Sequence, residues 1–353
     1  MDVRRLDALR ALAAVAEGAT VRRPVSGSDP DSAAAASADC VAAVLGDDLR
    51  RLSVLGAREG LPRSLGSVLG SYVVRCLYGF RGVASHVIPT PEIYWSNYGG
   101  LAVSRDGSTL LVSDGDLGSA IHEYRVADGM HVRTIGSPGT GPLQFNSPRQ
   151  LCISSDDFVF VAEHLNDRVQ VLTSRLDFHG FFGVGQLHHP AGVCADEDSV
   201  YVSESAGDRV SVFRRGDGAL RFRFGSSGRG DGQLHYPCGL CFTGKSHHIA
   251  VADNENCRIA VFTAKGEFVR HVGDDRLTYP TDVASSVCDD EIFVADYGNR
   301  RVAMFNGCGE LAKTLSLADE RGVASVAVHG DAVFAQTYHL CHRGDDLACV
   351  VFT

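Results

Sequence analysis

The chain has 353 residues, of which 44% are hydrophobic and 22% are charged, and its formal net charge at pH 7 is −10. This is the composition of a globular protein, and no apolar run approaches the roughly 18 residues that a membrane-spanning helix needs. An acidic chain has no general attraction to phosphate backbones, so RNA binding would require a local basic patch.

The first 70 residues differ in composition from the remainder, and we expect them to form a separate helical and low-complexity region. Ala- and Leu-rich segments with helical spacing occupy residues 8–19 and 40–56. Residues 22–39 between them are small, polar and proline-containing, which is typical of a flexible linker.

Several arginines near the N-terminus raise the alternative of a mitochondrial presequence. Asp2, Asp7 and Glu17 interrupt this basic stretch, and such presequences are poor in acidic residues. Eleven cysteines, an odd number, are scattered along the chain, which argues against a disulfide framework. We therefore expect a cytoplasmic protein with reduced thiols, and mitochondrial import is the minor alternative.

Residues 71–353 contain repeats of short apolar strands. Five repeats place an acid at the end of a strand, with successive separations of 49, 41, 49 and 43 residues. These acids are Asp114, Glu163, Glu204, Asp253 and Asp296. A proline opens the preceding strand in four repeats, at Pro148, Pro190, Pro237 and Pro280. A period in the forties with all-strand content predicts a β-propeller, with one four-stranded sheet per repeat.

The two ends of this region are predicted to share one composite blade. Residues 322–353 supply three strands and then stop, whereas residues 72–80 form an isolated fourth strand. Pairing them would clasp the first and last sheets and remove the exposed edges that invite aggregation. We therefore expect an all-β, six-bladed propeller over residues 71–353, with the last blade closed by the N-terminal strand.

An arginine follows the acid by five residues in four consecutive repeats. The acid ends one strand and the arginine opens the next, so the two side chains can meet across the turn as a bidentate ion pair. Because a catalytic group is needed once and not once per blade, we expect these pairs to hold blade register. The pairs are Glu163–Arg168, Glu204–Arg209, Asp253–Arg258 and Asp296–Arg301.

The recurring pattern of a strand-opening proline, a Val–Ala/Ser–Asp/Glu strand end and an Asn/Asp–x–Arg–Val/Ile turn resembles NHL repeats. The resemblance covers about residues 95–353. The first and last repeats depart from it, because Ser119 stands where Asp114 would have its arginine and Gln336 replaces the acid. The resemblance implies a propeller that binds protein or RNA. We find no RING or B-box pattern and no ladder of Cys-x2-Cys pairs of the kind that binds zinc, so ligase activity is not implied.

The preferred hypothesis for function is a non-catalytic protein-interaction platform that binds through the loops at the ends of the propeller channel. Fold alone does not determine function. We therefore choose candidate binding residues beside the strand-opening prolines. The candidate channel-mouth residues are His188, His189, His235, Tyr236 and Tyr279. The sequence leaves the protein partner and the oligomeric state open.

A metal-dependent enzyme is the first alternative. Six-bladed propellers of similar pattern include lactonases and the lyase that completes peptide amidation, which hold a metal near the channel. His188, His189 and His235 could bind zinc or calcium there, but residues 146–147 and 278–279 supply no further ligand in register. We therefore expect no cofactor and no metal. A second group with a spacing that fits no standard zinc finger consists of His339, Cys341, His342 and Cys349.

RNA binding is the second alternative. Strand alternation places Arg221 and Arg223 on one face and Phe222 and Phe224 on the other, so the phenylalanines belong to the core. An arginine-rich outer strand also guards against edge pairing, and the net charge disfavours RNA. The candidate basic patch consists of Arg214, Arg215, Arg221, Arg223 and Arg229.

Overall fold

The computed structural model describes residues 84–90, 99–115, 118–286, 290–316, 322–338 and 347–352. Within these ranges the chain is all-β, apart from the short 3₁₀ helix η1 (Tyr297–Asn299). None of the described helices is long and apolar enough to cross a membrane. The helical segments expected before residue 71 and the strand expected at 72–80 lie outside the described residues.

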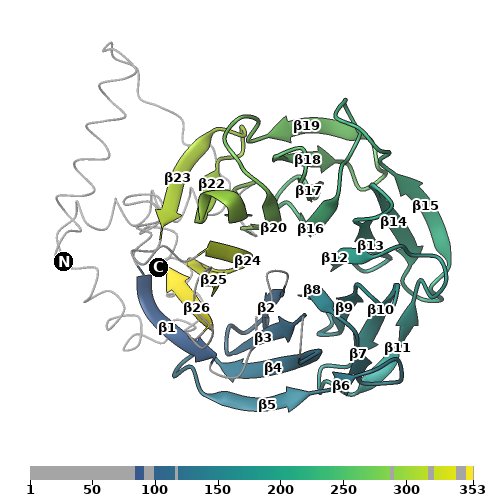
Figure 1. Cartoon of the computed structure of the whole chain (residues 1–353), viewed down its shortest axis with the longest axis vertical. Helices are drawn as coiled ribbons and strands as arrows, with labels where there is room; N and C mark the ends of the chain where they lie inside the picture. The colour runs from purple at the N-terminus through teal and green to yellow at the C-terminus, as the bar shows by residue number, and fades with distance from the viewer. Residues whose placement is uncertain are drawn as a thin grey trace, which may run out of the picture. The chain divides into compact units, whose positions relative to one another are not determined.

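Five sheets, which we name blades 1 to 5, each contain four antiparallel strands that follow one another in the chain (Figure 1). Blade 1 comprises β2 (Leu101–Val103), β3 (Thr109–Asp114), β4 (Ala120–Arg125) and β5 (His131–Ile135). Blade 2 comprises β8 (Pro148–Ile153), β9 (Val159–Glu163), β10 (Arg168–Leu172) and β11 (Phe178–Phe182). Blade 3 comprises β12 (Pro190–Ala195), β13 (Ser199–Glu204), β14 (Arg209–Arg214) and β15 (Leu220–Phe224).

The remaining regular blades have the same order. Blade 4 comprises β16 (Pro237–Phe242), β17 (Ile249–Asp253), β18 (Arg258–Phe262) and β19 (Phe268–Val272). Blade 5 comprises β20 (Pro280–Ser285), β21 (Ile292–Asp296), β22 (Arg301–Phe305) and β23 (Leu311–Ser316). A short parallel pair between blades 1 and 2 comprises β6 (Ser137–Pro138) and β7 (Gln144–Phe145). The predicted repeat period therefore corresponds to one sheet per repeat.

A further four-stranded sheet, the composite sheet, joins distant parts of the chain in the order β1–β26–β25–β24. Its strands are β1 (Ala84–Thr90), β24 (Gly322–His329), β25 (Ala332–Tyr338) and β26 (Leu347–Phe352). The expectation that residues 72–80 supply the fourth strand is wrong, because β1 pairs with β26 instead. Pro89 makes this strand hard to recognise in the sequence, but β1 is an edge strand, where a residue without an N–H group is tolerated.

The hydrophobic core lies between neighbouring sheets. The cluster between blades 3 and 4 includes Val210 and Phe224 from one sheet and Ile249 and Phe262 from the next. Every residue of β17 is buried, because adjacent blades cover both faces of its sheet. The outer strand β15 instead alternates between more and less exposed residues, as a strand with one covered face should. The composite sheet shares clusters with both blade 5 and blade 1.

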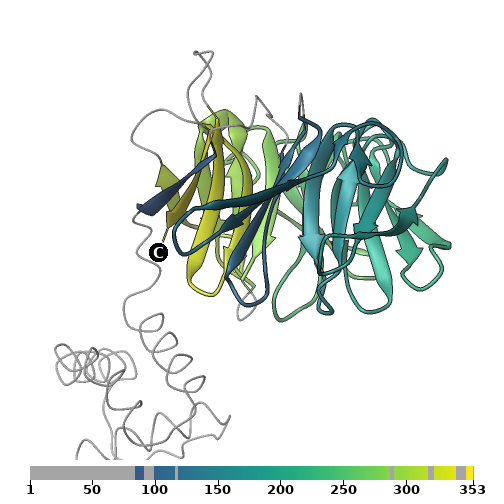
Figure 2. The ribbon, with the colours of Figure 1, turned by 90° about the horizontal axis from the view of Figure 1, so that it is seen from below.

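The strands run between two ends that carry the connecting turns (Figure 2). The inner strands β2, β8, β12, β16, β20 and β24 surround the centre (Figure 1). We name as the entry face the end at which the chain enters the inner strands, marked by Pro148, Pro190, Pro237 and Pro280. The opposite face carries the turns that leave the inner strands, which include residues 154–158, 196–198 and 243–248.

Candidate functional site

The four expected acid–arginine pairs form at the entry face. In blade 4, Arg258 Nε lies 2.8 Å from Asp253 Oδ2, and Asn256 Nδ2 donates to the same carboxylate. The pair also holds the loop that leads into the inner strand, because Asp253 accepts the His235 N–H at 2.7 Å and Arg258 donates to the Gln233 carbonyl at 3.2 Å. Burial raises the pKa of Asp253, against which these hydrogen bonds act.

The same arrangement recurs in the neighbouring blades. The Nε-to-carboxylate distances are 2.8 Å for Arg168–Glu163, 2.9 Å for Arg209–Glu204 and 2.7 Å for Arg301–Asp296. All four carboxylates are fully buried, and each pair joins residues directly opposite each other in the sheet. The pairs therefore hold the turn after the second strand against its own blade. Their geometry is that of residues that stabilise the fold.

The centre of the propeller is closed by side chains. Gln150 Nε2 of blade 2 donates to Asp282 Oδ1 of blade 5 at 2.7 Å, and Gln150 Oε1 accepts the N–H groups of Val193 at 2.9 Å and Leu240 at 3.1 Å. Ser325 of the composite sheet donates to Asp282 Oδ2 at 2.5 Å. The remaining cavity has a volume of about 20 Å³, enough for a single water molecule.

Two glycines make room for this closure. A Cβ atom at Gly239 would overlap with Asp282 Oδ1, and one at Gly192 would lie 2.8 Å from Gln150 Oε1. Burial raises the pKa of Asp282 to about 6, while its hydrogen-bond donors act in the other direction. The sequence patterns described above do not predict this network. Its signal was the second position after the strand-opening proline, where polar Gln150 and Asp282 stand in two repeats and Gly192 and Gly239 in the two between them.

The predicted channel-mouth residues lie on the entry face as separate loop positions. His188, His189 and His235 are exposed, Tyr236 is half-buried, and Tyr279 is 46% exposed. The His189 ring contacts the ring of His164, which the sequence analysis did not single out, with centroids 4.6 Å apart. Among the residues that the structure describes, no three His, Cys, Asp or Glu side chains are grouped so as to hold a metal ion.

The backbone explains why these positions recur. The residue before the strand-opening proline has a positive φ in four blades, with values of 52° at Ser147, 52° at His189, 52° at Tyr236 and 49° at Tyr279. Residues other than glycine seldom adopt this conformation, so tertiary contacts must hold it. Asp167 and Asp208 supply such contacts by accepting the N–H groups of His189 at 2.7 Å and Tyr236 at 2.8 Å.

The five arginines of the predicted basic patch are dispersed and engaged in different contacts. Arg221 donates to Ser199 Oγ at 2.6 Å, and Arg223 donates to Ser211 Oγ at 3.0 Å, both from the outer strand of blade 3. Arg214 pairs with Asp217 in an exposed turn on the opposite face, and Arg229 lies in an exposed loop on the entry face. Phe224 is buried against Phe262, as the alternation predicts.

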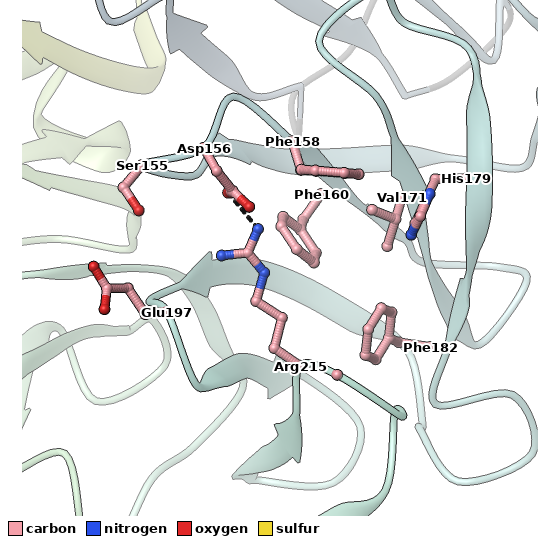
Figure 3. Close-up of a pocket in the computed structure, with 10 residues that line it drawn as sticks. Ser155, Asp156, Phe158, Phe160, Val171, His179, Phe182, Glu197 and Arg215 are labelled. Atoms are coloured by element: carbon pink, nitrogen blue, oxygen red, sulfur yellow. Dashed lines mark hydrogen bonds and ion pairs between the residues drawn. The ribbon is translucent and has the colours of Figure 1, made fainter.

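Arg215 occupies a cavity between blades 2 and 3 on the opposite face (Figure 3). Its side chain is only 14% exposed and forms an ion pair with Asp156. It also donates to the Asp196 carbonyl at 3.0 Å and to Ser154 Oγ at 3.2 Å, and its guanidinium carbon lies 5.4 Å from the Phe160 ring centroid. Partial burial acts to raise the pKa of Asp156, but the hydrogen bonds from Arg215 and Ser154 outweigh it and lower the pKa.

This seam cavity has a volume of about 500 Å³, and its wall includes Phe158, Phe160, Val171 and Phe182. A second cavity of about 400 Å³ adjoins it between blades 3 and 4. We call the two together the opposite-face groove, because both are lined by Ser155 and Glu197. The second cavity is further lined by Ala195, Asp196, Asp198, Phe242 and His247.

Comparison with known proteins supports the repeat assignment. The family model of the NHL repeat matches residues 234–262, which begin before β16 and end with β18. No curated protein sequence matches the chain.

Several solved structures have a similar fold. A virginiamycin B lyase from Staphylococcus aureus is 14% identical with a TM-score of 0.54, and the match covers 76% of this chain and 98% of that one. A chain of a nidogen–laminin complex is 17% identical with a TM-score of 0.53, covering 65% and 84%. U3-55K is 12% identical with a TM-score of 0.55, covering 78% and 100%. At these identities the likeness concerns the fold alone. The matched repeat and the arrangement of four-stranded sheets together support an NHL-repeat β-propeller.

Proposed function

We propose that the propeller is a non-catalytic protein-interaction platform whose binding surface is the opposite-face groove. The observation that carries the proposal is the contrast between a centre closed by Gln150 and Asp282 and two adjoining cavities of about 500 and 400 Å³ that open on the opposite face. A closed centre offers no room for a substrate, so a ligand would bind at the face. Apolar walls with a charged rim are typical of protein-binding surfaces.

The contacts of the groove favour a protein over RNA. Asp196, Glu197 and Asp198 would repel a phosphate backbone, and Arg215 is already engaged by Asp156. The similar fold in a nidogen–laminin complex is compatible with a propeller that takes part in protein assembly. RNA binding therefore remains the weaker alternative.

The catalytic alternative rests on zinc or calcium near the channel. The fold of the virginiamycin B lyase is compatible with an enzyme, but this similarity does not extend to residues of a site. Metal analysis of the purified protein tests this alternative, since near-stoichiometric zinc or calcium would favour it over the platform.

We further infer that the composite sheet acts as a sixth blade that closes the ring. The contacts of β24 with both β20 and β2 support this inference, as does the pairing of β1 with β26. Closure of this kind protects sheet edges from pairing with other chains.

We also propose a cytoplasmic location, in which the described cysteines would stay reduced. Burial, which raises the pKa of Cys152 to about 12, makes that thiol unreactive.

The platform proposal is tested by quantitative capture of cellular proteins on three full-length baits. These are the wild type, the double variant Glu197→Lys/Asp198→Lys in the groove, and Asp231→Lys, which reverses one negative charge at an 82% exposed entry-face residue. We expect the captured partner to be lost from the double variant and retained by Asp231→Lys. Equal capture by all three baits, or loss from Asp231→Lys alone, would contradict a binding role for this groove.

A further inference from the structure

We propose that the opposite-face groove binds a basic segment of a partner protein, with a large apolar side chain in the seam cavity and a nearby Lys or Arg in the adjoining cavity. This inference rests on the proposed function and specifies the chemistry of its partner. It follows from three features of the groove: an apolar wall, an arginine that is already satisfied, and a carboxylate rim beside stacked aromatic rings.

The seam cavity between blades 2 and 3 fits an apolar anchor. Phe160 and Val171 are fully buried at its base, while Phe158 and Phe182 are half-buried at its sides. The exposed His179 ring packs against Phe158 with centroids 4.9 Å apart and extends this wall. A volume of about 500 Å³ admits an aromatic or long aliphatic side chain. Filling it would cover apolar surface that the fold leaves partly open to water.

Arg215 does not make this cavity an anion site. Its guanidinium donates to Asp156, to the Asp196 carbonyl and to Ser154 Oγ, so its charge and several of its donors are already used within the protein. An incoming phosphate or carboxylate would have to displace Asp156. The role of Arg215 is therefore to join blade 3 to blade 2 and to border the apolar wall of this cavity.

The adjoining cavity between blades 3 and 4 fits a cation. One side carries Glu197 and Asp198, and the other carries Phe242 and His247, whose rings are stacked with centroids 4.3 Å apart. Asp196 lies beside this aromatic side, with its Oδ2 atom 3.8 Å from His247 Nε2. Asp196 Oδ1 accepts two backbone N–H groups of its own turn, which fixes that turn, whereas Glu197 and Asp198 are exposed. A Lys or Arg side chain between carboxylates and an aromatic face gains from both.

The two cavities are close enough to be occupied by one segment, because Ser155 and Glu197 line both. Figure 3 shows Glu197 on the other side of the seam cavity from His179 and Phe182. The apolar anchor and the cationic residue would therefore be separated by only a few residues of the partner. The acidic chain as a whole, with a net charge of −10, also favours encounter with a basic partner.

The test is selection of a random peptide library on the immobilised full-length protein, followed by binding measurements with the enriched peptide. We expect enriched sequences to contain Lys or Arg within a few positions of Trp, Phe or Leu. Fluorescence anisotropy should show binding that is at least about tenfold weaker for Glu197→Lys/Asp198→Lys and unchanged for Asp231→Lys. Replacing the apolar residue of the peptide with Ser should weaken binding about tenfold as well.

Several outcomes would overturn the proposal: enrichment of acidic peptides, no enrichment, or equal binding to the double variant. Displacement of the selected peptide by a labelled single-stranded oligouridylate would overturn it in favour of RNA. Thermal unfolding of each variant shows whether a loss of binding reflects a loss of fold. If the selection fails while cellular capture still depends on the groove, the partner chemistry is wrong and the platform proposal stands. If capture is also independent of the groove, both are wrong.

Discussion

The interior of the propeller and its opposite face both carry charged residues, but these residues have different surroundings. Inside, Asp282 and the Asp253–Arg258 pair are buried and held by several hydrogen bonds each. On the opposite face, the Arg214–Asp217 pair is half-exposed, and Glu197 borders an open groove. Charges in the interior are thus held by several partners within the fold, whereas Glu197 on the opposite face is exposed to solvent.

The largest expected effect comes from breaking a buried pair. Arg258→Ala would leave the fully buried Asp253 carboxylate without its cation, and we expect a loss of about 3–5 kcal/mol in the free energy of unfolding. Arg214→Ala, which breaks a pair with side chains 56% and 52% exposed, should cost less than about 1 kcal/mol. Urea unfolding of both variants measures the difference. Similar losses of stability in the two variants would contradict the distinction between buried and exposed ion pairs.

A smaller effect is expected from pH acting on Asp282. Its pKa in the folded protein, about 6, lies above the ordinary value of 3.8, so the folded state binds the proton more tightly than the unfolded state. The contribution of this group to stability is therefore fully present below about pH 4 and is lost as the pH rises through about 6. Asp282→Asn should flatten this part of the stability profile, measured by urea unfolding between pH 4 and 7. If the dependence of stability on pH is the same in Asp282→Asn and the wild type, the raised pKa of Asp282 is contradicted.

Two glycines allow the packing of the closed centre to be compared with that of the opposite face. In Gly239→Ala the new methyl group would overlap with Asp282 at the closed centre, so we expect a loss of about 1–3 kcal/mol. Gly216→Ala on the opposite face adds a methyl group with no atom within 4 Å, and its stability should change by less than about 0.5 kcal/mol. Thermal unfolding distinguishes the two. Equal effects would mean that the centre adapts more readily than its packing indicates.

An equally small effect on stability is expected at His247, whose side chain is 57% exposed. His247→Ala should change the free energy of unfolding by less than about 0.5 kcal/mol, but it removes one aromatic wall of the adjoining cavity. We therefore expect weaker binding of the selected basic peptide with an unchanged melting temperature. A fall in melting temperature with unchanged binding would place His247 with the interior residues instead.

The local pattern of the sequence was enough to predict the sheets of the regular blades and their acid–arginine pairs. The spacing of acids such as Glu204 and Asp253 located one sheet per repeat, and the arginines five residues later lie directly opposite them in the structure. The closing strand was misplaced, because Pro89 obscures the strand at Ala84–Thr90 and only its pairing with β26 identifies it. Strand alternation and turn length depend on residues that are close together in the chain, so they can be predicted from the sequence.

The tertiary structure alone decided which polar residues meet. Gln150 and Asp282 lie 132 positions apart, and Arg215 reaches an acid 59 positions earlier, so neither contact could be read from a repeat. The sequence by itself determined the repeat, its strands and their pairs, since these depend on neighbours within one hairpin. The ring arrangement determined the closed centre and the open groove, because both are formed by side chains from different blades, whose contacts a pattern within one hairpin does not specify.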